Sequence, residues 1–238
     1  MNQVNLRIEQ IFAHAAALQQ NGRLRNTVYC YKKFIYILNQ DHTVFLRFTL
    51  RDTEMSFENP ISFNANDYES KQFHEENGRI LFIQEDEDYI RTKSCKTPQF
   101  SPKKINSMFI KKKKKEFKRS NEVVLKSSLL SKADDDLSHI EFHVEDGEFV
   151  IIQRNIYSGS LITIKKNNKK SGLMTSADKL KDFKPIGLRT NDFAALFSFA
   201  KVVNFYFNND DMVWFESKDK KMPFIGMVSQ CVYDELGG

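Results

Sequence analysis

Glycine, proline and cysteine are scarce in this sequence. Its 238 residues include 9 glycines, 5 prolines and 3 cysteines. The few glycines, and the absence of G-x-G-x-x-G and G-x-x-x-x-G-K-[S/T] spacing, leave little from which to build a phosphate-cradling loop. The odd cysteine count without a C-x-x-C pair argues against a disulfide framework and predicts reduced, structural thiols in an intracellular protein.

Long apolar runs and catalytic patterns are lacking too. The longest apolar runs have strand length and residues 1–10 have no signal-peptide core, so we expect no membrane span. His139 and His143 form an H-x3-H pair, but no further ligand stands at zinc spacing, which favours surface imidazoles. The acidic stretch 85–88 lacks the calcium-loop pattern. We therefore expect no enzyme, no catalytic residue, no metal and no cofactor.

Phenylalanine and lysine are abundant. There are 21 phenylalanines, which suits packing between sheets. The formal net charge is +5 with a pI near 8.9, so a polyanionic partner is permitted. Lysine fills 111–115, followed by Lys118 and Arg119. This charge run does not suit a core, and it is typical of a solvated inter-domain connector, a nuclear-import signal or a nucleic-acid contact.

The clearest pattern runs through 186–215. Thr190 is a predicted N-cap, and apolar residues behind it recur at i, i+3, i+4 and i+7, which indicates a helix. The period then changes, because 203–207 and 212–215 are rich in aromatic and β-branched residues and predict a hairpin that turns at 208–211. The helical stripe consists of Phe193, Leu196, Phe197 and Ala200.

The first half has a similar order of elements. Segment 5–18 predicts a helix and 27–50 predicts three strands. Asn66-Asp67-Tyr68 stands where Asn191-Asp192-Phe193 stands later, an offset of 192 − 67 = 125 residues. A second helix is expected there, followed by two strands joined by the acidic turn 85–87.

The second half repeats this order. It opens with 123–126 and predicts a helix at 127–137, three strands within 139–166, a mobile loop at 167–182 and a final strand after the hairpin. Each half therefore reads as helix, three strands, helix and paired strands, which predicts an internal repeat. We expect an α+β protein with domains at 1–110 and 123–238, helices on one face of antiparallel sheets, and a basic connector at 111–122.

Three stretches resemble the DNA sliding clamps of the processivity fold, the family of proliferating cell nuclear antigen. TVYCYKKFIYILNQDHTVFLRFTLR resembles the first-domain strands, LLSKADDDLSHIEFHVEDGEFVI the opening of the second domain, and LRTNDFAALFSFAKVVN its long helix. Within the last, F-x-x-L-x-S-F-A looks closer to the largest subunit of the DNA-damage checkpoint clamp. The resemblance covers nearly the whole chain.

The resemblance implies two tandem processivity-fold domains per subunit, with three subunits closing a ring around duplex DNA. Such a ring binds DNA without reading its sequence, and it needs cationic side chains that face the phosphates. An ordinary solvated face is the alternative for the first helix, and Asp134, Asp135 and Asp136 are unusual on a helix that faces DNA. The expected DNA-facing residues, placed on or near the helices, are Arg7, His14, Arg23, Lys71, Lys126, Lys132 and Lys201.

The resemblance also implies two protein-binding surfaces. A groove for partner peptides is expected at Gln40, His42, Phe45, Phe117, Met227 and Val228, although Phe45, Met227 and Val228 fit an ordinary core equally well. Edge strands near 104–110 and 160–166 are expected to pair neighbouring subunits. Their interface residues are Met108, Ile110, Leu161 and Ile162.

Several functions remain open at this level. The first is a checkpoint-type clamp subunit in a heterotrimer, and the second is a homotrimeric replicative clamp, cellular or viral. A third is a monomeric basic subunit that holds a polymerase on DNA, and a fourth is a scaffold without a DNA role. The clamp hypotheses imply a clamp loader, polymerase or repair and checkpoint factors as partners, no membrane, and a nuclear location, or replicating DNA elsewhere in the cell for a viral protein.

Overall fold

The chain folds into two compact units, Met1–Lys112 and Lys113–Gly238. The computed structural model describes residues 6–17, 26–39, 43–65, 72–76, 79–85, 90–94, 121–127, 139–146, 148–154, 161–164, 173–175, 184–207, 212–217 and 219–231. The division between the units lies within the lysine run 111–115. In the described part of the chain, no helix is long and apolar enough to cross a membrane.

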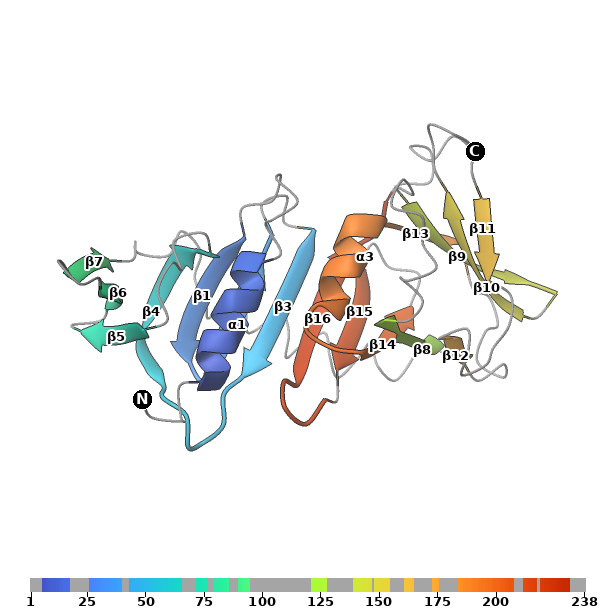
Figure 1. The fold of residues 1–238 in the computed structure, drawn as a ribbon. Helices are drawn as coiled ribbons and strands as arrows, with labels where there is room; N and C mark the ends of the chain where they lie inside the picture. The colour runs from blue at the N-terminus through green and yellow to red at the C-terminus, as the bar shows by residue number, and fades with distance from the viewer. Residues whose placement is uncertain are drawn as a thin grey trace. The chain divides into compact units, whose positions relative to one another are not determined.

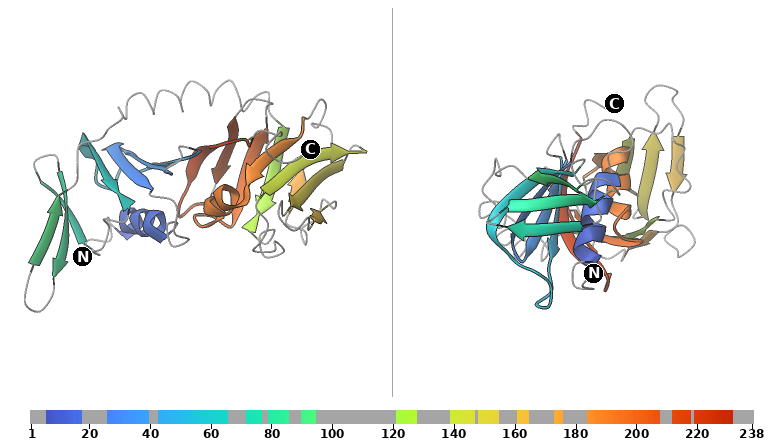
Figure 2. Two further views of the ribbon diagram at one scale, coloured as in Figure 1. Left: turned by 90° about the horizontal axis from the view of Figure 1, so that it is seen from above. Right: turned by 60° about the vertical axis from the view of Figure 1, so that its left-hand side comes forward.

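The first unit contains an antiparallel sheet covered by a helix. Its elements are α1 (Leu6–Ala17), β1 (Thr27–Lys32), β2 (Phe34–Leu38), β3 (Val44–Thr49) and β4 (Phe57–Asn64). The strands pair in the order β3-β2-β1-β4. Figures 1 and 2 show α1 against one face of this sheet. The helix expected at 5–18 and the three strands expected at 27–50 are confirmed.

The apolar stripe of α1 explains this packing. Ile8, Ile11, Phe12 and Ala15 are fully buried, as residues on one side of an amphipathic helix should be. The Phe12 and Phe63 rings meet edge to face with centroids 4.9 Å apart. Phe63 pairs with Val28, so Val28 and Cys30 lie on the helix face of the sheet. Alternation places the neighbouring side chains on the opposite face, called the outer face below. It carries Tyr29, Tyr31, Phe34, Tyr36, Phe45 and Arg47.

Strand β4 was not anticipated from the sequence, because Pro60 interrupts it. Proline cannot donate to a ladder, so a strand that contains it belongs at a sheet edge or at a bulge. Both conditions hold here, since β4 pairs only with β1 among the described strands and the register shifts between Cys30 and Lys32. Pro60 lies inside this shift, between Phe57, which pairs with Lys32, and Ile61, which pairs with Cys30.

A second sheet completes the first unit. It consists of β5 (Gln72–Glu76), β6 (Arg79–Glu85) and β7 (Ile90–Ser94), paired in that order. The two strands expected around the acidic turn are confirmed as β6 and β7. The helix expected from Asn66 lies outside the described residues as far as position 71. Gln72 and Phe73, which were expected at its end, belong instead to strand β5.

Among its described residues, the second unit has two antiparallel sheets and one helix. The first sheet contains β12 (Leu173–Thr175), β8 (Asn121–Lys126), β14 (Val202–Phe207), β15 (Met212–Ser217) and β16 (Phe224–Ser229), paired in that order. The second contains β11 (Leu161–Ile164), β10 (Glu148–Arg154), β9 (His139–Glu145) and β13 (Ile186–Arg189). The helix is α3 (Thr190–Phe197).

Phenylalanine fills the core between these layers. The Phe193 ring of α3 lies 5.9 Å from Phe142 of β9 and 5.5 Å from Phe205 of β14. Phe142 also lies 5.1 Å from Phe207, so one aromatic cluster joins the helix to both sheets. Large rings make many contacts in a core of this kind and account for the abundance of phenylalanine. The hairpin expected after the helix is confirmed as β14 and β15.

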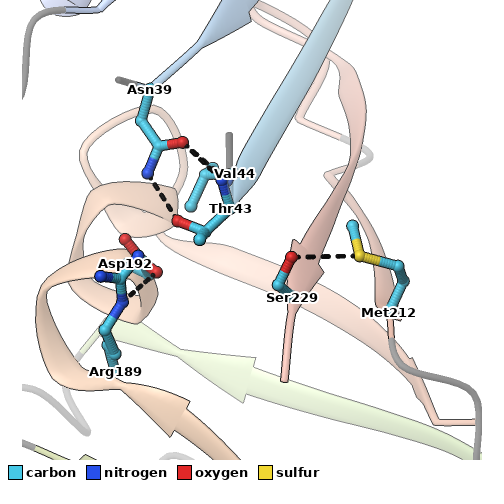
Figure 3. Close-up of polar contacts among 7 residues, drawn as sticks. All are labelled: Asn39, Thr43, Val44, Arg189, Asp192, Met212 and Ser229. Atoms are coloured by element: carbon cyan, nitrogen blue, oxygen red, sulfur yellow. Dashed lines mark hydrogen bonds and ion pairs between the residues drawn. The ribbon is translucent and has the colours of Figure 1, made fainter. Parts of the chain in front are cut away.

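The start and end of α3 differ from expectation. Thr190 is the first helical residue, and its buried Oγ1 has no hydrogen-bond partner, so it does not act as the predicted N-cap. Arg189 Nε donates instead to Asp192 Oδ2 at 3.0 Å (Figure 3), and a carboxylate in the first turn suits the helix dipole. Ala200 lies beyond the end of the helix, but it is only 6% exposed, so its predicted burial is confirmed.

Three further assignments in the second unit need correction. The segment 167–182, expected to be a loop, contains the short strand β12, which pairs with β8. Strand β13 was not anticipated. The connector expected at 111–122 extends too far, because Asn121 and Glu122 already belong to β8. The helix expected at 127–137 lies outside the described residues from position 128 on.

The two units share one topology. In the first, the meander β1-β2-β3 has β4 paired beside β1, and in the second, the meander β9-β10-β11 has β13 paired beside β9. A second sheet follows in both, β5-β6-β7 or β14-β15-β16. The strand order of the predicted internal repeat is therefore confirmed in the described residues, and the unanticipated strands β4 and β13 are equivalent.

Candidate nucleic-acid interface and partner surfaces

Arg7 does not lie on an exposed helix face as predicted. The residue is 8% exposed. Its Nη1 donates to Glu54 Oε2 at 2.8 Å, and both Nη1 and Nη2 donate to the Thr49 carbonyl at 3.2 Å. The Glu54 side chain is itself only 5% exposed. The guanidinium is therefore neutralised and enclosed, and it ties α1 to the segment after β3 rather than presenting charge to DNA.

The remaining exposed face of α1 is almost uncharged. Leu6 is 53% exposed, and Gln10 and Ala13 are exposed as well. These positions recur at i, i+4 and i+7 and so share one side of the helix. His14 is half-buried beside them. Among its described residues, this side of α1 thus offers close approach and hydrogen bonding, and two half-buried titratable groups, Glu9 and His14, border it.

The second unit brings two predicted cations together. Lys126 pairs with Val202, and the Ser127 amide donates to the Lys201 carbonyl at 2.8 Å. Lys201 is exposed and Lys126 is half-buried. Neither residue lies on a helix as expected, since Lys126 ends β8 and Lys201 precedes β14. Their proximity comes from strand pairing, which joins residues 75 positions apart (201 − 126).

Two more lysines lie at the same end of this sheet. Strand β15 ends beside the start of β14, and Ser217 pairs with Phe224 at the start of β16. The connection between them carries Lys220 and Lys221, both exposed. Sequence analysis missed them because a K-D-K-K turn looks like any solvated loop until strand order is known. We call these four residues the cationic end of the second unit: Lys126, Lys201, Lys220 and Lys221.

Three of the predicted DNA-facing residues, Arg23, Lys71 and Lys132, lie outside the described residues. The same holds for Asp134, Asp135 and Asp136. Of the predicted DNA-facing residues, the structure therefore describes Arg7, His14, Lys126 and Lys201.

The predicted peptide groove is only partly supported. Met227 pairs with Trp214, and Val228 pairs with Val213. The Phe215 ring lies 6.0 Å from Phe205, which lies against α3. Alternation then puts Val228 on the α3 face and Met227 on the opposite face. Val228 is fully buried and belongs to the core, so its assignment to a groove is wrong.

Met227 and Phe45 lie on sheet faces turned away from the helices. Met227 is 3% exposed. Beside it, Ser229 Oγ donates to Met212 Sδ at 3.2 Å across the strand pair (Figure 3). Phe45 is half-buried on the outer face of the first unit. Gln40, His42 and Phe117 lie outside the described residues.

The turn that precedes Phe45 is anchored by Asn39. Its Oδ1 accepts from the amides of Thr43 at 2.8 Å and Val44 at 2.9 Å, and its Nδ2 donates to Thr43 Oγ1 at 2.7 Å (Figure 3). These bonds fix both ends of the segment that carries Gln40 and His42. Asparagine commonly stabilises turns in this way. The position of Asn39 before the polar sequence Q-D-H-T was therefore the feature of the sequence that could have predicted these hydrogen bonds.

The outer face of the first unit is aromatic and partly enclosed. Burial raises the pKa of Tyr36 well above its usual range, and burial also raises the pKa of Tyr29 and lowers that of Arg47. The Arg47 guanidinium carbon lies 5.0 Å from the Phe34 ring centroid, a cation–π distance. This face is thus a packed surface of rings around one cation.

Of the predicted subunit interface, Leu161 and Ile162 lie in β11. They pair with Arg154 and Gln153 of β10, and β11 ends the order of its sheet among the described strands. Met108 and Ile110 lie outside the described residues. Leu161 and Ile162 therefore lie on an edge strand of the described sheet.

The two histidines of the H-x3-H pair are not surface groups. His143 Nε2 lies 2.8 Å from Glu141 Oε2, and the side chains are 14% and 2% exposed. His139 is half-buried. The described residues contain no group of three or more histidine, cysteine, aspartate or glutamate side chains that could hold a metal ion.

Neither a family model nor a curated protein sequence matches the chain. Among solved structures, the chain is similar to the proliferating cell nuclear antigen of Entamoeba histolytica, with a TM-score of 0.53 and 10% sequence identity. The match covers 94% of this chain and 96% of that chain. The chain has the sliding-clamp fold. The fold class expected from the sequence, α+β with two processivity-fold domains, is confirmed.

The sliding-clamp fold accounts for the repeated topology. Both units are included, because the match extends over almost all of either chain. At 10% identity, little of the sequence itself is shared, so what the two proteins have in common is the order and pairing of elements. The similarity therefore establishes architecture, and the use of each surface has to be argued from the residues of this chain.

Proposed function

We propose that the chain is a non-catalytic clamp subunit that encircles duplex DNA and tethers partner proteins. The observation that carries the proposal is the clamp fold over 94% of the chain. The cationic end of the second unit supports it, since a clamp needs charge toward phosphates and no base contacts. The exposed face of α1 with Leu6, Gln10 and Ala13 is uncharged, which suits sliding, because it binds no single phosphate tightly.

Charge reversal at the cationic end tests the DNA contact. Lys126→Glu with Lys201→Glu removes two cations, and each phosphate contact adds about one unit to the slope of log affinity against log salt. We expect the slope to fall by about 2 and affinity to fall roughly tenfold at low salt. The measurement is a salt titration of duplex binding by anisotropy.

The matched control for this experiment is Lys32→Glu with Lys33→Glu. It changes net charge equally at the β1–β2 turn of the first unit. An equal loss of affinity in both variants would show that the cationic end has no special part in DNA binding, and it would remove that end from the proposed lining.

Encirclement has its own test. An assembled ring should remain on closed circular DNA at high salt and leave once the same DNA is cut, because a topological link does not depend on ionic contacts. Release from both forms with the same salt dependence would favour the monomeric DNA-binding subunit instead. Partner binding without any DNA retention would favour a scaffold.

Within the clamp class, we propose the checkpoint type, in which this chain is one subunit of a heterotrimer. Two features support it. The net charge is +5, and homotrimeric replicative clamps are usually acidic. The F-x-x-L-x-S-F-A pattern also occupies α3 and the residues after it, with Phe193, Leu196, Phe199 and Ala200 buried. The alternative is a homotrimeric replicative clamp.

The mass of the isolated chain separates these two types. A heterotrimer subunit should elute as a monomer of 27.9 kDa, whereas a homotrimer should weigh 3 × 27.9 = 83.7 kDa. Size-exclusion chromatography with light scattering measures this directly. A stable species near the higher mass would overturn the checkpoint assignment and leave the clamp proposal standing.

The remaining partners follow from the same proposal. Edge strand β11, with Leu161 and Ile162, is proposed to pair with a neighbouring subunit, because an edge presents unpaired backbone groups. The surface near the anchored turn at Asn39, with Gln40, His42 and Phe45, is proposed to take short peptides of polymerases or of repair and checkpoint factors. A clamp loader and a nuclear location are proposed on the same basis.

A further inference from the structure

The β1–β2 turn of the first unit has an unusual residue at a strained position. Tyr31 pairs with Phe34, so Lys32 and Lys33 form a two-residue turn. Lys32 has φ = 53°. This left-handed region favours glycine, asparagine and aspartate, and lysine adopts it at a cost. Strain of this kind is retained mostly where the side chain has a use.

The repeat supplies a comparison within the same chain. The equivalent turn of the second unit joins β9 and β10, where Glu145 pairs with Glu148. Its first residue, Asp146, has φ = 51°, and Gly147 follows it in the sequence. Asp-Gly is a favoured pair for such a turn. The backbone geometry is thus the same at the first position, where the second unit has aspartate and the first unit has lysine.

The surroundings of Lys32 and Lys33 are cationic and aromatic. The Lys32 ammonium lies 5.6 Å from the Tyr31 ring centroid and is exposed. Arg47 lies over Phe34 on the same outer face. Both rings are half-buried, and each already has a cation over it. Such an arrangement favours an anionic ligand over a nucleic-acid base, because a base needs a free ring face for stacking.

A carboxylate already occupies part of this site. Lys33 Nζ forms an ion pair with Asp52 Oδ1, and the Asp52 side chain is 95% exposed. The hydrogen bond and charge of Lys33 lower the pKa of Asp52. An ion pair this exposed is weak and readily exchanged. Asp52 therefore shows which chemistry the turn binds, and it also competes with any external ligand.

We propose that the β1–β2 turn, with Lys32, Lys33 and the flanking rings of Tyr31 and Phe34, docks an acidic segment of a protein partner. The choice of protein over nucleic acid rests on the proposed function, which places DNA on the α1 side of the sheet, whereas Tyr31 and Phe34 lie on the outer face. This surface is separate from the peptide groove proposed near Asn39.

The test uses a fluorescein-labelled oligoglutamate peptide and the isolated full chain. Lys32→Asn is expected to weaken peptide binding about fivefold, the upper range for one exposed ion pair. Because asparagine adopts the left-handed region more readily than lysine, this variant should be folded at least as stably as the wild type. Asp52→Asn should tighten binding, since it removes the internal competitor.

Asp146→Asn is the matched control for Asp52→Asn, because each removes one exposed negative charge, and it should leave binding unchanged. Absent peptide binding, or equal binding by wild type and Lys32→Asn, would overturn the proposal. A duplex oligonucleotide that loses affinity through Lys32→Asn as the peptide does would assign the turn to nucleic acid instead. None of these outcomes affects retention on circular DNA, so the clamp proposal stands or falls separately.

Discussion

Replacing Arg7 with alanine is expected to destabilise the first unit by about 3 to 5 kcal/mol. The substitution leaves the Glu54 carboxylate, whose side chain is 5% exposed, without its cationic partner. Removing one member of a buried ion pair costs this much because the other charge stays desolvated. It also removes the donors to the Thr49 carbonyl. Hydrogen exchange of the α1 and β3 amides measures the loss within this unit.

A double-mutant cycle identifies the cause. Glu54→Gln alone should also destabilise the unit, whereas Arg7→Met combined with Glu54→Gln should recover most of the stability, since no buried charge is then left alone. If Arg7→Ala lowered DNA affinity and left hydrogen exchange unchanged, Arg7 would be a DNA-facing residue after all and its burial would be irrelevant to function.

Arg7 also shows what sequence patterns omit. Helical periodicity located α1 correctly because four fully buried residues recur along it. Arg7 borders that stripe, and whether such a residue faces water or the protein depends on what lies nearby in space. The deciding partner, Glu54, is 47 residues away. No local pattern contains that information, so a basic residue on a helix was assigned to solvent and to DNA.

The unanticipated strands β4 and β13 have a different cause. Strand β4 contains Pro60, which is untypical of a strand, and β13 has only four residues directly before α3. Each strand pairs beside the first strand of its meander. Local propensity is weak in short or proline-containing segments, and the pairing that stabilises them comes from the sheet. Aligning the halves residue by residue was the available signal, since the two strands hold equivalent positions.

The predicted DNA-facing cations stay a prediction, but the structure places two of them differently from the sequence analysis. Lys126 and Lys201 were placed on helices, yet strand register brings them to one sheet end, where Lys220 and Lys221 join them. Which charged residues share a surface depends here on strand order and register and not on helical periodicity. The fold was predictable because order and spacing of elements survive where identity to a solved clamp is 10%. Surface side chains change freely between proteins of such low sequence identity, so their positions had to be read from the structure.

Replacing Gln153 with methionine is expected to stabilise the second unit, and this is the second large effect. The residue is fully buried on β10, and neither Nε2 nor Oε1 has a hydrogen-bond partner. Its neighbours across the strand pairs are Ile140 and Ile162. A buried polar atom without a partner costs about 1 to 3 kcal/mol. Gln153→Met keeps the length and lack of branching and removes both polar atoms, so we expect the second unit to gain about 2 kcal/mol.

Urea unfolding followed by the fluorescence of Trp214 measures this gain, because Trp214 is the one tryptophan of the sequence and lies 1% exposed in β15 of the same unit. A higher midpoint at an unchanged slope is the expected result. Gln153→Glu is the opposing control and should destabilise, since it introduces a charge where an amide is already unpaired. A lower midpoint for Gln153→Met would mean that the amide is bonded to buried water, which the methionine cannot replace.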